Sequence, residues 1–130
     1  MKALARHLLL ELDGCSRETL NDVEFLKSCL KEGATAAGAT IVSEAFFQFA
    51  PYGVSGVVII AESHLSIHTW PEYGYAAVDV FTCGMTTKPE KATALIAEKL
   101  GARTSKLREI KRGMVSEAPA AYPRQKAEVA

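Results

Sequence analysis

The sequence predicts an α+β fold, a two-layer sandwich in which two helices cover one face of a mostly antiparallel sheet. Segments with strand character outnumber those with helical periodicity, in the order strand, helix, about four strands, helix, strand. The 130 residues, 48% of them apolar, suffice for one core, and we expect a single domain over residues 1–117. The second face of the sheet then needs cover. This predicts a homodimer in which the sheets of two copies pair, and it permits a larger assembly.

The N-terminal half is interpreted as strand, helix and two further strands. Residues 3–12 are rich in leucine and are taken as a strand. Behind Ser16, apolar residues recur at helical spacing, which predicts one helix that ends near residues 33–38. The β-branched and aromatic residues of 40–49 and 54–61 indicate strands, separated by a turn that contains proline and glycine.

The C-terminal half is predicted to add two strands, a helix and a weaker last strand. Residues 64–70 alternate His, Ser, His and Trp with Leu, Ile and Thr, which is typical of a strand. A turn leads to a strand over 75–81, and Thr87 is a candidate N-cap of the second helix. A last strand over 104–110 and a flexible C-terminal tail over 118–130 complete the prediction.

The composition excludes several classes of function. Fifteen basic residues balance fifteen acidic ones, so neither nucleic acid nor an anionic membrane is an expected partner, and the substrate should be small. No run of apolar residues suits a signal peptide or a membrane span. The three cysteines contain no C-x-x-C pair, which argues against a disulfide framework. We therefore expect a cytoplasmic protein with free thiols.

The densest group of polar residues is 61–72, between apolar segments. One interpretation is a serine hydrolase that uses Ser63 or Ser55 with His68 and Asp79, but neither serine lies in a G-x-S-x-G motif. An ordinary structural role for these residues is the stronger alternative to a hydrolase.

A metal site is a second interpretation of the same segment. His64 and His68 are four residues apart, and Glu62 or Glu72 could add a carboxylate. Because a strand gives no reason for a third ligand to converge, we expect no metal.

Three stretches carry a specific resemblance. They are FAPYGVSG at 49–56, ESHLSIHTWPEYGYAAVD at 62–79 and FTCG at 81–84. In sequence and order they resemble the bacterial S-adenosylmethionine decarboxylase proenzyme family, whose members process themselves and depend on a pyruvoyl group. Composition and periodicity alone do not identify this family.

The resemblance implies self-cleavage between Glu62 and Ser63. Ser63 would attack the preceding carbonyl to give an ester, and elimination followed by loss of ammonia would turn it into the pyruvoyl group. By the same resemblance His68 is the proton acceptor in processing and Ser55 supports it. Strict alternation along a strand puts Ser63 and His68 on opposite faces, so we expect an irregular strand entry at Ser63.

The resemblance also implies the later chemistry. The pyruvoyl carbonyl would form a Schiff base with S-adenosylmethionine, and Cys83 would donate the proton after carbon dioxide leaves. Phe49 and Trp70 would stack on the adenine and Glu72 would hold the ribose. The product, S-adenosyl-methylthiopropylamine, is the aminopropyl donor for spermidine synthesis, and paired subunits would share active sites.

Other interpretations remain open at this stage. The aromatic residues could belong to the core, Cys83 could be a small buried residue, and Glu72 could be a solvated turn residue. A self-processing chain could instead decarboxylate arginine or ornithine, or the chain could be an unprocessed, non-catalytic homologue. His64, Ser66 and Asp79 receive no role.

Overall fold

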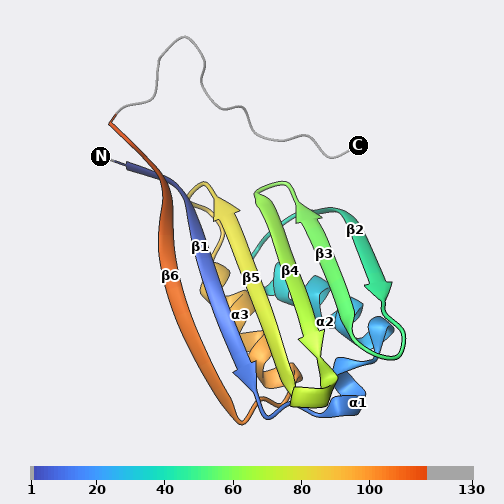
Figure 1. Ribbon diagram of the computed structural model, residues 1–130. Coiled ribbons are helices and arrows are strands. Elements are labelled where there is room, and N and C mark those ends of the chain that lie inside the picture. The colour runs from blue at the N-terminus through green and yellow to red at the C-terminus, as the bar shows by residue number, and fades with distance from the viewer. Residues whose placement is uncertain (1, 117–130) are drawn as a thin grey trace.

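The computed structural model describes residues 2–116, which form one six-stranded sheet with helices on one side (Figure 1). The elements are β1 (Lys2–Asp13), α1 (Arg17–Leu20), α2 (Val23–Ala36), β2 (Ile41–Gln48), β3 (Val54–Ile60), β4 (Ser63–Trp70), a 3-10 turn (Pro71–Tyr73), β5 (Tyr75–Cys83), α3 (Pro89–Lys99) and β6 (Thr104–Val115). The strand order is β2-β3-β4-β5-β1-β6, and every neighbouring pair is antiparallel. This confirms the predicted α+β sandwich.

The core lies between the sheet and the two long helices, α2 and α3, which Figure 1 shows on the same side of the sheet. Every second residue of β5 is buried, as expected for a strand with one face on a core. Leu30 of α2, Ile96 of α3 and Leu65 of β4 have no exposed surface. Burial of such side chains contributes about 1.5–3 kcal/mol each, so this layer fixes the positions of β4 and β5.

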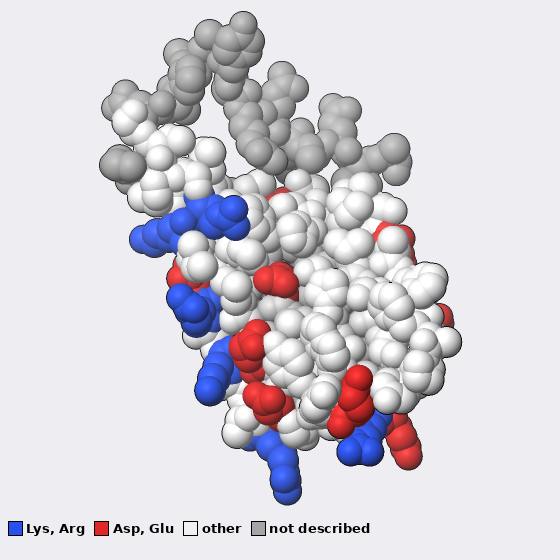
Figure 2. All heavy atoms as spheres, in the orientation of Figure 1, with Lys and Arg blue, Asp and Glu red and all other residues white. Residues whose placement is uncertain are grey.

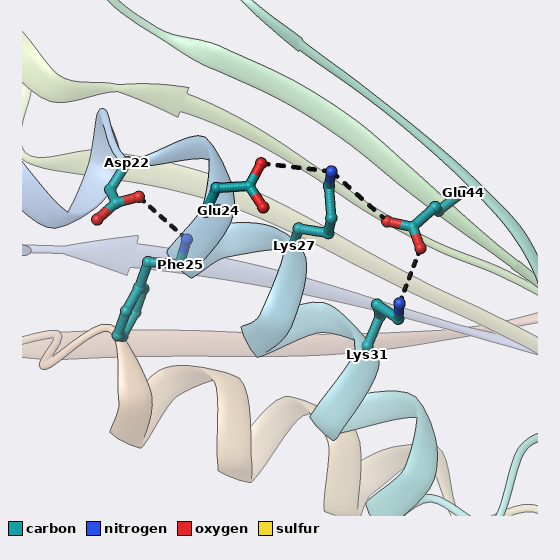
Figure 3. Close-up of polar contacts among 6 residues, drawn as sticks. All are labelled: Asp22, Glu24, Phe25, Lys27, Lys31 and Glu44. Carbon is teal, nitrogen blue, oxygen red and sulfur yellow. Dashed lines mark hydrogen bonds and ion pairs between the residues drawn. The ribbon is translucent and has the colours of Figure 1, made fainter.

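The predicted first helix is divided in two, which corrects the expectation of one continuous helix. Ser16 caps α1 through a hydrogen bond from the Thr19 N–H, and Asp22 caps α2 through one from the Phe25 N–H (Figure 3). An aspartate side chain competes for backbone N–H groups inside a helix and favours a new N-terminus. Asn21 therefore lies at a fixed junction between α1 and α2.

Charged side chains tie α2 to the edge strand β2 (Figure 3). Lys31 Nζ lies 2.8 Å from Glu44 Oε1, and Lys27 Nζ lies 4.0 Å from Glu44 Oε2; within α2, Lys27 Nζ also lies 3.4 Å from Glu24 Oε2. Such partly exposed pairs contribute about 0–1 kcal/mol each. The two lysines also line a groove of about 640 Å³, which contains none of the predicted site residues.

The predicted cap of the second helix is wrong. Lys88, not Thr87, occupies the N-cap position of α3, and Thr87 is buried with no hydrogen-bond partner for its hydroxyl among the described residues. Proline at position 89 begins the helix because its fixed φ suits the first helical residue and it has no N–H to satisfy.

The last strand is longer than predicted. β6 continues to Val115 because it pairs with β1 along its length, from Lys2–Val115 to Asp13–Thr104. Its side chains are almost all exposed, so the sequence carries little hydrophobic pattern there. The predicted tail over 118–130 lies outside the described residues.

The face of the sheet opposite the helices is open, and Figure 2 shows it in the same view. It carries few charges over β2, β3 and β4, whereas Lys and Arg side chains line the β6 edge. We call this the open face; its side chains on β3, β4 and β5 are Ser55, Val57, Ile59, His64, Ser66, His68, Trp70, Tyr75, Ala77, Asp79, Phe81 and Cys83. Its pairing with a second copy stays a prediction.

Candidate active site

Ser63 begins β4 with an unusual backbone. Its φ is 138°, the one positive value for a non-glycine residue between residues 2 and 116. Such a conformation costs a residue with a side chain about 1–3 kcal/mol, and it often marks a functional site. The irregular strand entry predicted for Ser63 is therefore confirmed.

The peptide bond before Ser63 is held by hydrogen bonds on its N-terminal side. The Cys83 N–H donates to the Glu62 carbonyl oxygen at 2.8 Å, and the Glu62 side chain accepts from the Thr40 N–H at 3.2 Å. A backbone N–H on a carbonyl oxygen stabilises the negative charge that develops when a nucleophile attacks that carbonyl. The site thus has the parts for attack by the neighbouring Ser63 hydroxyl.

Ser55 and His68 form a second group. They face each other across β3 and β4, and Ser55 Oγ lies 2.8 Å from His68 Nδ1. His68 is five residues beyond Ser63 on β4, a separation of about 17 Å at the rise of a strand. The structure therefore does not bring His68 to Ser63 within one chain.

The aromatic residues predicted for substrate lie near the Ser55–His68 end. Phe49 follows β2 and is 47% exposed, and Trp70 ends β4 and is 41% exposed. They are not core aromatics, which removes that alternative. Glu72 lies in the next turn and lines a cleft of about 340 Å³ together with Tyr52.

Asn21 holds the loop that carries Phe49. Its backbone carbonyl accepts a hydrogen bond from Gln48 Nε2 at 2.7 Å, and its Oδ1 accepts one from the Gly53 N–H at 2.8 Å. Both ends of the loop are therefore attached to the α1–α2 junction. Sequence reasoning did not find Asn21, because the contact depends on the tertiary fold and no local motif signals it.

The hydrolase triad is not formed. Asp79 Oδ1 lies 2.9 Å from His7 Nε2, and Asp79 Oδ2 accepts a hydrogen bond from Ser66 at 3.4 Å, so this carboxylate is engaged away from His68. Nor do the described residues contain a group of three or more His, Cys, Asp or Glu side chains that could hold a metal.

The thiols differ in their surroundings. Burial raises the pKa of Cys29 to about 12, and burial also raises the pKa of Cys15, with Asp13 adding to the shift. Cys83 is only partly buried and lies on the open face beside β1, so it is not the small buried residue of the alternative interpretation.

This difference predicts selective alkylation. Because the thiolate is the reactive form, iodoacetamide at neutral pH should modify Cys83 in the folded protein and leave Cys15 and Cys29 unmodified. Peptide mass mapping after short exposure measures this, with urea-unfolded protein as the control in which all three react. Modification of Cys29 before Cys83 in folded protein would contradict the assigned environments.

Sequence comparison first identifies the class of protein to which the relatives belong: they are decarboxylases that are made as proenzymes. The chain is 55% identical over 116 residues to the S-adenosylmethionine decarboxylase proenzyme of Thermodesulfovibrio yellowstonii, covering 89% of this chain and 86% of the relative. It is 53% identical to that of Carboxydothermus hydrogenoformans, covering 90% and 92%. A family model described as S-adenosylmethionine decarboxylase matches residues 6–113. The chain belongs to the S-adenosylmethionine decarboxylase family, which confirms the predicted resemblance.

Structural comparison agrees. The crystal structure of the adenosylmethionine decarboxylase from Aquifex aeolicus VF5 matches with a TM-score of 0.84 and 38% sequence identity, covering 92% of this chain and 98% of that one. Separately, none of the helices in residues 2–116 is long and apolar enough to cross a membrane.

Proposed function

We propose that this chain is a self-processing decarboxylase that converts S-adenosylmethionine to S-adenosyl-methylthiopropylamine. It cleaves itself between Glu62 and Ser63 into fragments 1–62 and 63–130, the second of which carries a pyruvoyl group. The observation that carries the proposal is the strained Ser63 backbone next to a carbonyl held by the Cys83 N–H at 2.8 Å. Membership of the family supports it.

Self-cleavage needs only the chain and one water molecule. Ser63 Oγ attacks the Glu62 carbonyl carbon, and the C–N bond breaks as the C–O bond of an ester forms and the nitrogen gains a proton. A base then removes the Ser63 Cα proton, and the Cβ–O bond breaks to release the Glu62 carboxylate and leave dehydroalanine. Water then adds at the former Cα of Ser63, where its oxygen becomes the carbonyl oxygen of the pyruvoyl group and the nitrogen leaves as ammonia.

Ser63 fits its role as the source of the pyruvoyl group. Its strained backbone favours cleavage at this point. Cys83 comes directly after Thr82, which is the cross-strand partner of Ser63 on β5. When formed, the pyruvoyl group supplies the carbonyl that accepts the electrons released as carbon dioxide leaves. Cys83 then gives the substrate α-carbon its new proton.

The exposed aromatic residues fit a nucleoside. Phe49 and Trp70 each offer an accessible ring, and stacking on such rings suits adenine and a sulfonium cation. Glu72 can accept hydrogen bonds from the two ribose hydroxyls. These residues favour S-adenosylmethionine over arginine or ornithine, which have no base to stack.

A complete site requires two copies of the chain. Ser63 and Cys83 lie at one end of β4 and β5, whereas Ser55 and His68 lie at the other end of the β3–β4 hairpin. If two open faces pair about a two-fold axis perpendicular to the strands, the ends are exchanged. The Ser63 of one protomer then meets the His68 of its partner, and the dimer contains two such sites.

A single domain over residues 1–117 and a cytoplasmic location complete the proposal.

Intact-mass measurement of purified protein tests the proposal. We expect two fragments in place of the 14.0 kDa chain, with the larger one lighter than a serine-ended fragment by one ammonia. Carbon dioxide release and borohydride trapping with S-adenosylmethionine, arginine or ornithine then identify the substrate. A chain that stays whole would contradict self-processing, and turnover of arginine or ornithine alone would contradict the substrate.

A further inference from the structure

His64 lies beside the serine that starts the self-cleavage. Its Nδ1 is 3.5 Å from Ser63 Oγ, and this is the one side-chain partner of that hydroxyl among the described residues. A contact of this length is at the limit for a hydrogen bond, but contacts used in catalysis often shorten only when the reaction geometry is reached. Any base for the first step must lie within reach of this hydroxyl.

The His64 ring is held in place by its neighbours on β5 and β1. It stacks on Phe81, its cross-strand partner, with ring centroids 5.5 Å apart and an interplanar angle of 10°. Phe81 is fixed in turn by the His7 ring at 5.1 Å and by the Arg112 guanidinium at 5.5 Å. The imidazole is thus an oriented group, not a free side chain.

The surroundings keep His64 in the form that accepts a proton. Burial lowers its pKa, the charge of Asp79 acts in the opposite direction, and His7 lowers it further. The net direction is downward, so the ring is neutral at pH 7. A neutral imidazole whose Nδ1 is unprotonated can act as a general base.

We propose that His64 is the catalytic base of the first step of self-cleavage. As Ser63 Oγ bonds to the Glu62 carbonyl carbon, its proton moves to His64 Nδ1, and the Cys83 N–H stabilises the charge on the carbonyl oxygen. The imidazolium then returns the proton to the Ser63 nitrogen as the C–N bond breaks, so no net proton is consumed. This rests on the proposed function and leaves His68 to remove the Cα proton in the second step.

Hydroxylamine separates the two steps, because it cleaves an ester quickly and a peptide bond very slowly. In His64→Ala we expect self-cleavage to slow about a hundredfold, with no acceleration by hydroxylamine because no ester forms. In His68→Ala we expect the ester to accumulate, so that hydroxylamine releases both fragments. Gel analysis of freshly purified full-length chains measures both rates.

Two controls separate catalysis from packing. Free imidazole should partly restore cleavage in His64→Ala, which a merely structural role would not allow. Ile59→Ala removes side-chain packing beside His64, because Ile59 is its cross-strand partner on β3, without touching Ser63 or the ring of Phe81, and it should cleave within about twofold of the wild-type rate. If His64→Ala misfolds, His64→Asn tests the same loss of basicity with a polar side chain.

The outcomes distinguish this inference from the proposed function. A wild-type rate in His64→Ala, or rapid release of its fragments by hydroxylamine, would overturn the role of His64 alone. A wild-type chain that never cleaves would overturn both.

Discussion

Replacing Ser63 with alanine is expected to leave one uncleaved 14.0 kDa chain without decarboxylase activity. Alanine has no Oγ to attack the Glu62 carbonyl, so neither the ester nor the pyruvoyl group can form. We expect activity to fall by at least about a thousandfold, as in enzymes that lose a nucleophile. Intact mass and carbon dioxide release from S-adenosylmethionine measure the two effects.

Ser66 provides the matched control. It lies on the same strand and makes one long hydrogen bond, to Asp79 at 3.4 Å, so Ser66→Ala should still cleave at residue 62. Ser63→Gly separates chemistry from strain, because glycine tolerates the φ of 138°. It should remain uncleaved, yet its free energy of unfolding should exceed that of Ser63→Ala by about 1 kcal/mol. Cleavage of Ser63→Ala at the same bond would refute the assignment of the nucleophile.

Part of this site could be predicted from the sequence because the fold there follows local rules. Strict alternation along β4 would put the side chains of Ser63 and His68 on opposite faces of the sheet. In the structure the regular strand geometry is interrupted at Ser63, whose φ is positive. The family motifs indicated the residues to which we assign self-processing. They did not indicate His64, although its position next to Ser63 was the available signal.

Other features could not be predicted because they depend on strand register and tertiary contacts. The bond from the Cys83 N–H to the Glu62 carbonyl exists only because the pairing of β4 with β5 continues to Ser63–Thr82, beyond the strand ends predicted at residues 64 and 81. The tight turn after Ile60 fixes the pairing of Ser55 with His68. This pairing can be predicted from the sequence only if the ends of the two strands are known. The full length of β6 was missed because its exposed side chains give no periodic signal.

A mixture of Ser63→Ala and His68→Ala chains should cleave itself although each variant alone does not. In a dimer of one chain of each kind, one site combines the intact Ser63 of one protomer with the intact His68 of its partner, and the other site lacks both. With equal co-expression and random pairing, about half of the His68→Ala chains should be cleaved, and no Ser63→Ala chain should be. Different tags on the two variants let intact mass assign the fragments.

The geometry also specifies two variants that must not complement each other in a mixed dimer. Ser55 and His68 are in direct contact at 2.8 Å, so Ser55→Ala and His68→Ala damage the same half of each site. Every site in their mixed dimer lacks one of the two residues, and cleavage should stay at the level of the separate variants. Recovery in this mixture, or none in verified mixed dimers of Ser63→Ala and His68→Ala, would contradict the shared site. For one chain to hold Ser63, Cys83, Ser55 and His68 in a single site, His68 would have to move along β4 by about five residues. The pairing of β4 with β3 and β5 prevents this movement.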